Sequence, residues 1–216
     1  MVGRFYVKAS GPLALFTVPE FRQEKCTYQV PTYDAVKGLL ESIYWKPTIM
    51  WVPERLRVMK PIRTQSIMTN ALDENRRRKQ VIQTYLHDVC YHIQARMEWN
   101  PDPKYAADQN PGKHLDIARR SIEKGGRLDT FLGARECQCA VVPLLDIMDG
   151  RGTYDDSGNL YLGTMLHGID YPAGEGGKHV RRLWRDVVMT NGIIKFPDPW
   201  NPQEDRLVRD ELEGRH

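Results

Sequence analysis

The sequence predicts an α+β fold with a mixed first part and a smaller, mostly β second part. Two stretches carry the apolar stripe of an amphipathic helix, and several others alternate apolar and polar residues as half-buried strands do. From Phe131 onward, short strand-like runs are separated by glycines. Of the 216 residues, 41% are hydrophobic and 27% are charged, so the chain has enough apolar material for a core, which excludes wholesale disorder.

The first part opens with a strand and a helix. Arg4–Ala9 alternates polar and apolar residues and is therefore predicted to be a strand. Tyr33–Tyr44 places its apolar residues on one stripe and follows Thr32, a favourable N-cap, so it is predicted to be a helix. Pro47 prevents this helix from continuing and places its exit at residues 44–46.

Further strands and a second helix complete the first part. Thr48–Val52 and Arg55–Met59 are predicted strands with a break at Pro53. Thr84–Trp99 is predicted to be a long strand, and Lys113–Lys124 carries the second helical stripe. The order strand, helix, strand, strand, helix, strand resembles that of a ferredoxin-like domain.

The second part, residues 135–216, is predicted to be a small antiparallel β-rich domain with a polar tail. Its glycine-punctuated runs are too short for helices of ordinary length. The predicted elements from the boundary onward are strands at Phe131–Val142, Thr153–Tyr154, Asn159–Leu166 and Gly192–Phe196, a short helix at 181–185 and a helical turn at Glu204–Glu211.

Charge, cysteine content and hydropathy show which classes of protein the sequence does not fit. Residues 1–197 carry 28 Lys and Arg against 22 Asp and Glu, whereas the last nineteen residues carry three Arg against six acidic groups. The four cysteines show no CxxC spacing, so neither a disulfide framework nor a zinc ribbon is predicted, and no cofactor is expected. No apolar run is long enough to cross a bilayer, and the start of the chain does not resemble a secretory signal. The expected location is the cytoplasm.

The most informative local feature is Gly112-Lys113-His114 at the start of the second helix. A helix N-terminus presents unsatisfied N–H donors and a partial positive charge, so Lys and His are electrostatically unfavourable there. A docked anion, commonly a phosphate, would reverse that penalty. The alternative is that both side chains point to solvent, where the penalty is only about 0.3–1 kcal/mol. The spacing alone slightly favours this alternative.

Aromatic and basic residues suggest contacts with a nucleic acid. Eight Lys and Arg between residues 55 and 79 suit a phosphate backbone, although such a run is usually a solvated face. Tyr44 and Trp45 could stack on unpaired bases, but aromatics at a helix end more often belong to the core, and Trp45 is predicted to pack there. The sequence contains no P-loop, Ser-His-Asp order or metal-binding carboxylate set. If the protein cuts a phosphodiester, we expect the 2′-hydroxyl of RNA to be the nucleophile, without a metal.

Several motifs spread in order over most of the chain match one family. They are Tyr28-x-Val30-Pro31-Thr32-Tyr33, the run Glu41–Thr48, the run Leu56–Ile62, Gly112-Lys113-His114, the run Phe131–Cys137 and Leu162-Gly163-Thr164-Met165-x-His167-Gly168. Through these residues the chain resembles the type I-C CRISPR-associated endoribonucleases of the Cas-five group. Met68–Gln83 and the tail beyond Pro199 are the segments least like the family.

The resemblance implies a ferredoxin-like, or RNA-recognition-like, catalytic domain at residues 1–134 with a basic thumb-like insertion at 68–83. It implies metal-independent cleavage of CRISPR repeat transcripts at the base of the repeat hairpin, giving a 2′,3′-cyclic phosphate and a 5′-hydroxyl. The protein would stay on the 5′ handle of the guide RNA, beside the backbone, large and small subunits of the type I-C surveillance complex and near target DNA. The alternative is a non-catalytic subunit that caps the 5′ handle.

The family's catalytic trio falls on Tyr44, Lys113 and His114 in this sequence. His114 would be the general base or the general acid, and Lys113 would stabilise charge on the phosphorus. Tyr44 would orient the nucleophile or supply the second proton-transfer group, and the sequence does not decide between these roles. The candidate RNA-contacting residues are Lys46, Arg57, Lys60, Arg63, Arg76, Arg77, Arg78, Lys79, Arg127 and Arg135.

Overall fold

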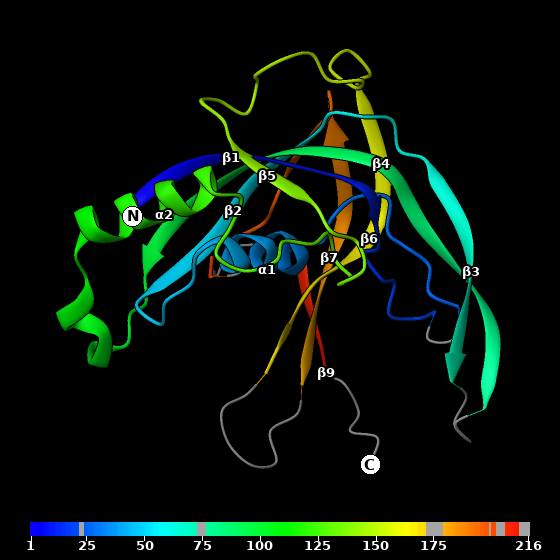
Figure 1. The fold of residues 1–216 in the computed structure, drawn as a ribbon, viewed down its shortest axis with the longest axis horizontal. Coiled ribbons are helices and arrows are strands. Elements are labelled where there is room, and N and C mark those ends of the chain that lie inside the picture. The colour runs from blue at the N-terminus through cyan, green and yellow to red at the C-terminus, as the bar shows by residue number, and fades with distance from the viewer. Residues whose placement is uncertain (22–23, 73–76, 172–178, 199, 202–205, 212–216) are drawn as a thin grey trace.

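One mostly antiparallel sheet organises the chain in a computed structural model, which describes all residues except 22–23, 73–76, 172–178, 199, 202–205 and 212–216 (Figure 1). The strands are β1 (Gly3–Ala14), β2 (Ile49–Val58), β3 (Thr64–Leu72), β4 (Arg78–Trp99), β5 (Ala140–Pro143), β6 (Asn159–Asp170), β7 (Val180–Thr190), β8 (Ile193–Lys195) and β9 (Leu207–Glu211). The helices are α1 (Tyr33–Ile43), the 3-10 helix η1 (Pro103–Asp108) and α2 (Pro111–Glu123). The strand order is β5-β1-β4-β2-β8-β7-β6, with β3 paired to β4 and β9 paired to β7.

The middle of the sheet is held by apolar residues that face each other across three strands. Val7 of β1 and Leu56 of β2 both lie opposite Ile93 of β4, and all three are at most 1% exposed. The strand predicted at Arg4–Ala9 is confirmed and extends to Ala14. The predicted break at Pro53 is a bulge within one continuous strand, because the register shifts there between β2 and β4.

Helix α1 forms where the sequence predicts it, because its capping and its apolar stripe agree. The Thr32 side chain accepts a hydrogen bond from the N–H of Ala35 at 3.2 Å, as an N-cap does. Val36, Leu40 and Ile43 are at most 2% exposed and form the buried stripe. Neither α1 nor any other helix of the described residues is long and apolar enough to cross a membrane.

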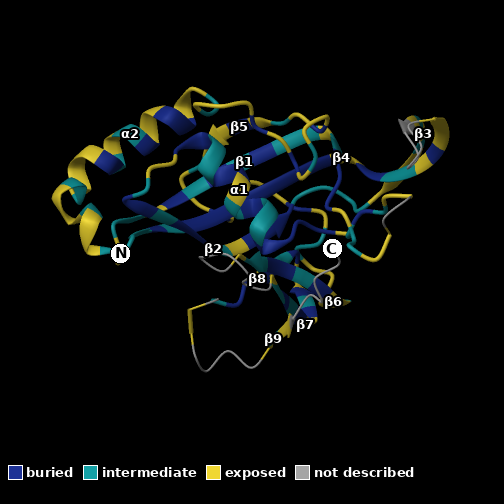
Figure 2. Cartoon of the chain, turned by 90° about the horizontal axis from the view of Figure 1, so that it is seen from below, coloured by how far each residue is buried: buried dark blue, intermediate teal, exposed yellow. Residues whose placement is uncertain are grey.

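The described parts of the insertion at 68–83, residues 68–72 and 77–83, form an arm. Strand β3 pairs with the first part of β4 from Thr64 opposite Leu86 to Leu72 opposite Arg78. Figures 1 and 2 show this hairpin projecting from the body at the end of the long axis opposite α2. Large apolar side chains on it are exposed, including Met68 at 62% and Ile82 at 48%. Its function as a thumb stays a prediction.

The second part of the chain differs from the prediction in four elements. Thr153–Tyr154, a predicted strand, lies in a turn. Residues 181–185 lie in strand β7 and are not helical, because they pair with strands β6 and β9 and bury alternate side chains, Arg182 and Trp184. The predicted turn at Glu204–Glu211 is strand β9 from Leu207, and residues 202–205 lie outside the described residues. Of the strand predicted at Phe131–Val142, only the β5 end forms.

Strands from both parts of the chain share one hydrogen-bonded sheet. Arg55, Leu56 and Arg57 of β2 pair with β8, and β8 also pairs with β7 through Ile193 and Ile194. Figure 2 shows that the sheet strands carry most of the buried residues, whereas α2 alternates buried and exposed positions. The division into domains at residues 134 and 135 stays a prediction.

Candidate active site

Tyr44 is fixed where α1 ends. The backbone turns from helical to extended at this residue, with φ −155° and ψ 121°, and its N–H still donates to the carbonyl of Leu40. Its own carbonyl accepts a hydrogen bond from Trp51 Nε1 at 2.7 Å. The side chain is 0% exposed, so the phenol points into the protein. Backbone and ring are therefore both held.

His114 reaches the same place from the first turn of α2. Asn110 caps this helix, because its side-chain oxygen accepts a hydrogen bond from the N–H of Lys113 at 3.1 Å. The imidazole of His114 is 0% exposed, and its Nδ1 lies 2.7 Å from the hydroxyl oxygen of Tyr44. The Trp99 ring packs edge-on against it, with 5.5 Å between centroids. The fold thus brings together two side chains that are 70 residues apart.

The hydrogen bonds of His114 set the tautomer of its neutral ring. Nε2 lies 2.9 Å from the carbonyl oxygen of Asp108. A carbonyl only accepts, so Nε2 must carry a hydrogen and donate it. Nδ1 is then the acceptor, and the Tyr44 hydroxyl donates to it. The one lone pair of the neutral ring therefore faces Tyr44.

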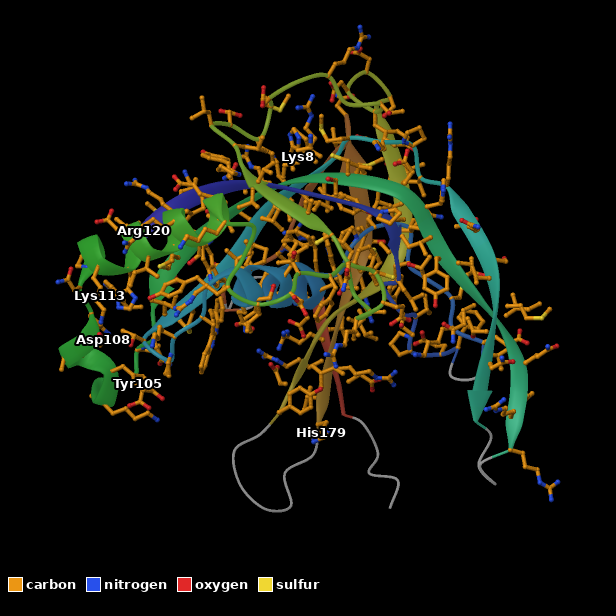
Figure 3. The ribbon with its side chains drawn as sticks, in the orientation of Figure 1. Lys8, Tyr105, Asp108, Lys113, Arg120 and His179 are labelled. Atoms are coloured by element: carbon orange, nitrogen blue, oxygen red, sulfur yellow. The ribbon has the colours of Figure 1, made fainter. Side chains whose placement is uncertain are left out.

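Asp108 connects the remaining groups of the site. Its carboxylate accepts a hydrogen bond from Lys113 Nζ and another from Thr48 Oγ1, the latter at 2.8 Å. The same carboxylate lies 3.4 Å from His114 Nε2. The bonds from Lys113 and Thr48 lower the pKa of Asp108 to about 2, and the Asp108 hydrogen bond raises the pKa of Lys113. Figure 3 shows Lys113 and Asp108 together where η1 meets α2.

A carboxylate of the chain itself, that of Asp108, lies against the side chains of Lys113 and His114. The alternative in which both side chains point to solvent is wrong for His114, which is completely buried, while the Lys113 side chain is 47% exposed. Asp108 and Thr48 were not predicted as site residues. A signal was present, because a Lys and a His in a first turn without an acid favour a nearby carboxylate, and Asp108 precedes the N-cap by two residues.

A glycine turn after α2 packs against the end of α1 and carries Arg127. Gly126 has φ +117°, and a β-carbon there would lie 3.0 Å from the carbonyl oxygen of Leu128. The N–H of Arg127 donates to the carbonyl of Ile43, and its guanidinium carbon lies 5.7 Å from the centre of the Tyr44 ring. Burial raises the pKa of Tyr44, and the charges of Lys113 and Arg127 oppose that shift.

The structure corrects the prediction for Arg57, which is a buried residue that supports the fold. It is 1% exposed, and its guanidinium donates to the Asp155 carboxylate at 3.0 and 2.6 Å. It also donates to the carbonyls of Ile147 and Gly150, at 3.2 and 3.0 Å. The buried guanidinium holds the 147–155 loop and contradicts the prediction that Arg57 contacts RNA.

The other predicted RNA-contacting residues fall in different places. Lys46 and Arg127 are exposed near Tyr44, whereas Lys60 forms an ion pair with Asp88 at 2.6 Å. Arg63 immediately precedes β3, and the arm lies at the opposite end of the molecule from α2 (Figure 1). The remaining exposed residues are Arg77, Arg78 and Lys79 on or beside the start of β4 and Arg135 before β5, while Arg76 lies outside the described residues.

The structure also corrects the prediction for the Trp45 side chain. The sequence predicts core packing, but the side chain is 55% exposed. Because the backbone is extended at Tyr44, neighbouring side chains point to opposite sides, so an inward Tyr44 requires an outward Trp45. An exposed indole therefore lies next in sequence to the buried phenol.

The chemistry available at the site comes from four groups: a phenol, an imidazole, an ammonium and a carboxylate. Within the described parts of the chain, no three His, Cys, Asp or Glu side chains gather as ligands for a metal ion. All four cysteines are free, and two of them, Cys90 and Cys137, are buried.

Known proteins resemble this chain over most of its length. A family described as "CRISPR-associated protein (Cas_Cas5)" matches residues 6–197. A protein of Mannheimia succiniciproducens named "CRISPR pre-crRNA endoribonuclease Cas5d" is 30% identical over 223 residues, covering 91% of this chain and 96% of the relative. A protein of Thermus thermophilus with the same name is 32% identical over 186 residues, covering 81% and 77%.

Two solved structures share the fold. One, described as the crystal structure of a CRISPR-associated protein, has 32% sequence identity and a TM-score of 0.77, covering 96% of each chain. The other is a functionally uncharacterized protein, SMU1763c from Streptococcus mutans, with 31% identity and a TM-score of 0.75, covering 96% of this chain and 97% of that one.

Proposed function

The chain belongs to the CRISPR-associated Cas5 family, and on this premise we propose that it is an endoribonuclease that cleaves CRISPR precursor RNA. The two relatives named as pre-crRNA endoribonucleases support the activity and the substrate class. The observation that carries the proposal is the buried hydrogen bond of 2.7 Å between Tyr44 and His114, one residue from the Lys113 ammonium. It provides two proton-transfer groups beside a cation.

The proposed reaction uses the 2′-hydroxyl of the RNA as nucleophile. Its oxygen forms a bond to the phosphorus while its proton passes to a base, and the bond to the 5′-oxygen breaks as that oxygen takes a proton from an acid. The products are a 2′,3′-cyclic phosphate and a 5′-hydroxyl. Tyr44 and His114 supply the acid and the base, and Lys113 stabilises the charge that grows on the phosphoryl oxygens. Because the chain supplies each role, we propose that cleavage needs no metal.

RNA has to open the site, since neither Tyr44 nor His114 is exposed. We propose that the scissile phosphate takes the place of the Asp108 carboxylate. Lys113 and Thr48 already bind an anionic oxygen there, and a phosphate offers the same kind of acceptor. Displacement of the carboxylate from Lys113 and Thr48 would leave the Asp108 carbonyl as the hydrogen bond between η1 and His114, so that η1 could move aside and admit the substrate.

The same burial favours a second candidate function, a non-catalytic subunit that caps the 5′ handle of the guide RNA. In that case Tyr44 and His114 hold the end of α1 against α2. In either case we propose that the protein stays on the 5′ handle in a type I-C surveillance complex, with the cations of the arm toward RNA. We also propose that β1, α1, β2, β4, α2 and β5 form a ferredoxin-like unit, which the antiparallel order β5-β1-β4-β2 supports.

Cleavage of the cognate repeat RNA in excess EDTA tests the proposal. We expect one cut at the base of the hairpin, a cyclic phosphate on the upstream product and a large loss of rate in Lys113→Ala. Lys104→Ala is the matched control, because Lys104 also pairs with an aspartate of the same segment, Asp102, at 2.6 Å. Tight binding without cleavage at any metal concentration would instead establish the capping subunit. Cleavage that EDTA abolishes would contradict the metal-independent mechanism.

A further inference from the structure

An apolar pocket opens beside the buried site. Its lining includes Ser42, Trp45, Lys46, Pro47, Arg127 and Leu128. Two of its large apolar side chains are exposed to solvent, Trp45 at 55% and Leu128 at 69%. Exposed apolar side chains are ordinary when they are scattered, but these two line the same pocket and give it an apolar surface.

The walls of this pocket are held by backbone hydrogen bonds. The N–H of Leu128 donates to the carbonyl of Ser42 at 3.1 Å, and the N–H of Arg127 donates to that of Ile43 at 3.2 Å. The extended backbone at the α1 exit, followed by Pro47, fixes the direction of Trp45. A ligand would therefore enter a preformed space and would not need to order a loop.

The charge around the pocket suits an anion. Lys46 and Arg127 are its cations, and Glu41, the acid that also lines it, lies 3.7 Å from Lys37. Arg127 is shared with two adjoining pockets, one of which contains Arg120 and Lys124. The other contains the acid Asp129 as well as Lys124. A line of cations thus leads from the indole along α2.

We propose that this pocket binds one unpaired nucleobase of the RNA, stacked on the Trp45 indole, with the adjoining phosphate held by Arg127. An indole face next to a guanidinium matches a base joined to a phosphate, because every base offers a flat π-face and stacking tolerates any sequence. The inference rests on the proposed function for one detail: the guanidinium of Arg127 also lies over the Tyr44 ring, which makes the stacked base the one next to the cut.

The test measures the affinity of the full-length protein for repeat RNA that carries a 2′-deoxyribose at the expected cut, the base of the hairpin, and so cannot react there. We expect Trp45→Ala to weaken binding about 5- to 150-fold, the range for loss of one stacked base. Trp45→Phe retains an aromatic face and should lose much less. Trp200→Ala is the matched control, since Trp200 is 51% exposed and lines a different pocket with Asp34 and Arg182.

An abasic nucleotide placed at each position around the cut locates the base. At one position it should weaken binding as much as Trp45→Ala does, and the two changes together should weaken it no further. Affinity of Trp45→Ala within twofold of the parent protein, or losses that multiply at every position, would overturn the inference. Cleavage of unmodified RNA is read in parallel. If the RNA is cut but Trp45→Ala binds it normally, the stacking proposal is wrong and the endoribonuclease proposal stands. If Trp45→Ala weakens binding but the RNA is never cut, the endoribonuclease proposal is wrong and the stacking proposal stands.

Discussion

Replacing Tyr44 by Phe removes one oxygen atom from the site and leaves the ring, its packing and its contact with Arg127 in place. The lost group is the donor of the 2.7 Å hydrogen bond to His114 Nδ1, and both partners are completely buried. An unpaired buried acceptor costs about 1–3 kcal/mol, so the free energy of unfolding should fall by that amount. A domain of ordinary stability, about 5–15 kcal/mol, remains almost entirely folded after such a loss.

The effect on cleavage should be larger than the effect on folding can explain. A proton-transfer group contributes about a hundred- to ten-thousand-fold in rate, which corresponds to about 3–5.5 kcal/mol in the activation barrier. We therefore expect Tyr44→Phe to lower the single-turnover cleavage rate by at least a hundredfold at saturating protein, with RNA affinity unchanged. Urea denaturation followed by fluorescence gives the free energy of unfolding for the same preparation.

Tyr85→Phe is the matched control. Tyr85 is 4% exposed, and its hydroxyl donates to Gln83 at 2.7 Å, so this variant should lose stability and keep its cleavage rate. A Tyr44→Phe protein that is destabilised as expected and still cleaves within threefold of the parent rate would contradict a proton-transfer role for Tyr44. Tyr44 would then be a structural partner of His114 and no part of the chemistry.

Three further predictions concern groups that hold the site or the fold. Hydrogen bonds lower the pKa of Asp108 to about 2 in the folded protein, so the unfolded chain binds more protons in acid. The stability that this group contributes is therefore present above pH 4 and is lost as the pH falls from about 4 to 2. Asp108→Asn should lose that part of the acid dependence of the unfolding midpoint; an unchanged acid dependence would contradict the assignment. Arg57→Ala should lower the free energy of unfolding by about 3–5 kcal/mol because it leaves Asp155 without its buried partner, whereas exposed Arg63→Ala should leave it unchanged, both measured by urea denaturation. Gly126→Ala should cost about 1–3 kcal/mol by the same measurement, since φ is +117° there, and a full-stability variant would show that the turn relaxes.

The elements that the sequence predicted well are those whose signals are local. The N-cap at Thr32, the apolar stripe of α1 and the alternation of β1 lie within a few residues of what they specify, and each was found. Strand β7 was missed because its period of two is broken at Asp186, which adopts a left-handed backbone, and because a cation is buried within it. Without a clear period of two, the spacing of Arg181, Arg182 and Arg185 was interpreted as one face of a short helix.

Burial of charge and contacts between distant residues could not be predicted from residue types. Arg57 looked like its basic neighbours, and what distinguishes it is a set of partners 90 to 98 residues away, Asp155 and the carbonyls of Ile147 and Gly150. The family resemblance gave Tyr44, Lys113 and His114, but it did not give Asp108, whose position depends on the path of η1. Trp45 was assigned to the core because the extended backbone at the helix exit was not foreseen.

The most direct test of the proposed metal-independent cleavage compares the single-turnover rates of the parent protein and of His114→Ala on cognate repeat RNA, both in EDTA. His114 carries the one lone pair of the neutral ring that faces Tyr44, so its loss should remove proton transfer while Lys113 and the RNA-binding surface remain. We expect cleavage by the parent protein to yield a cyclic phosphate and the variant to bind the RNA but cut it at least a hundredfold more slowly. Equal rates for the two proteins would contradict the role of His114 in proton transfer, and no cleavage by either would contradict the proposed endoribonuclease activity.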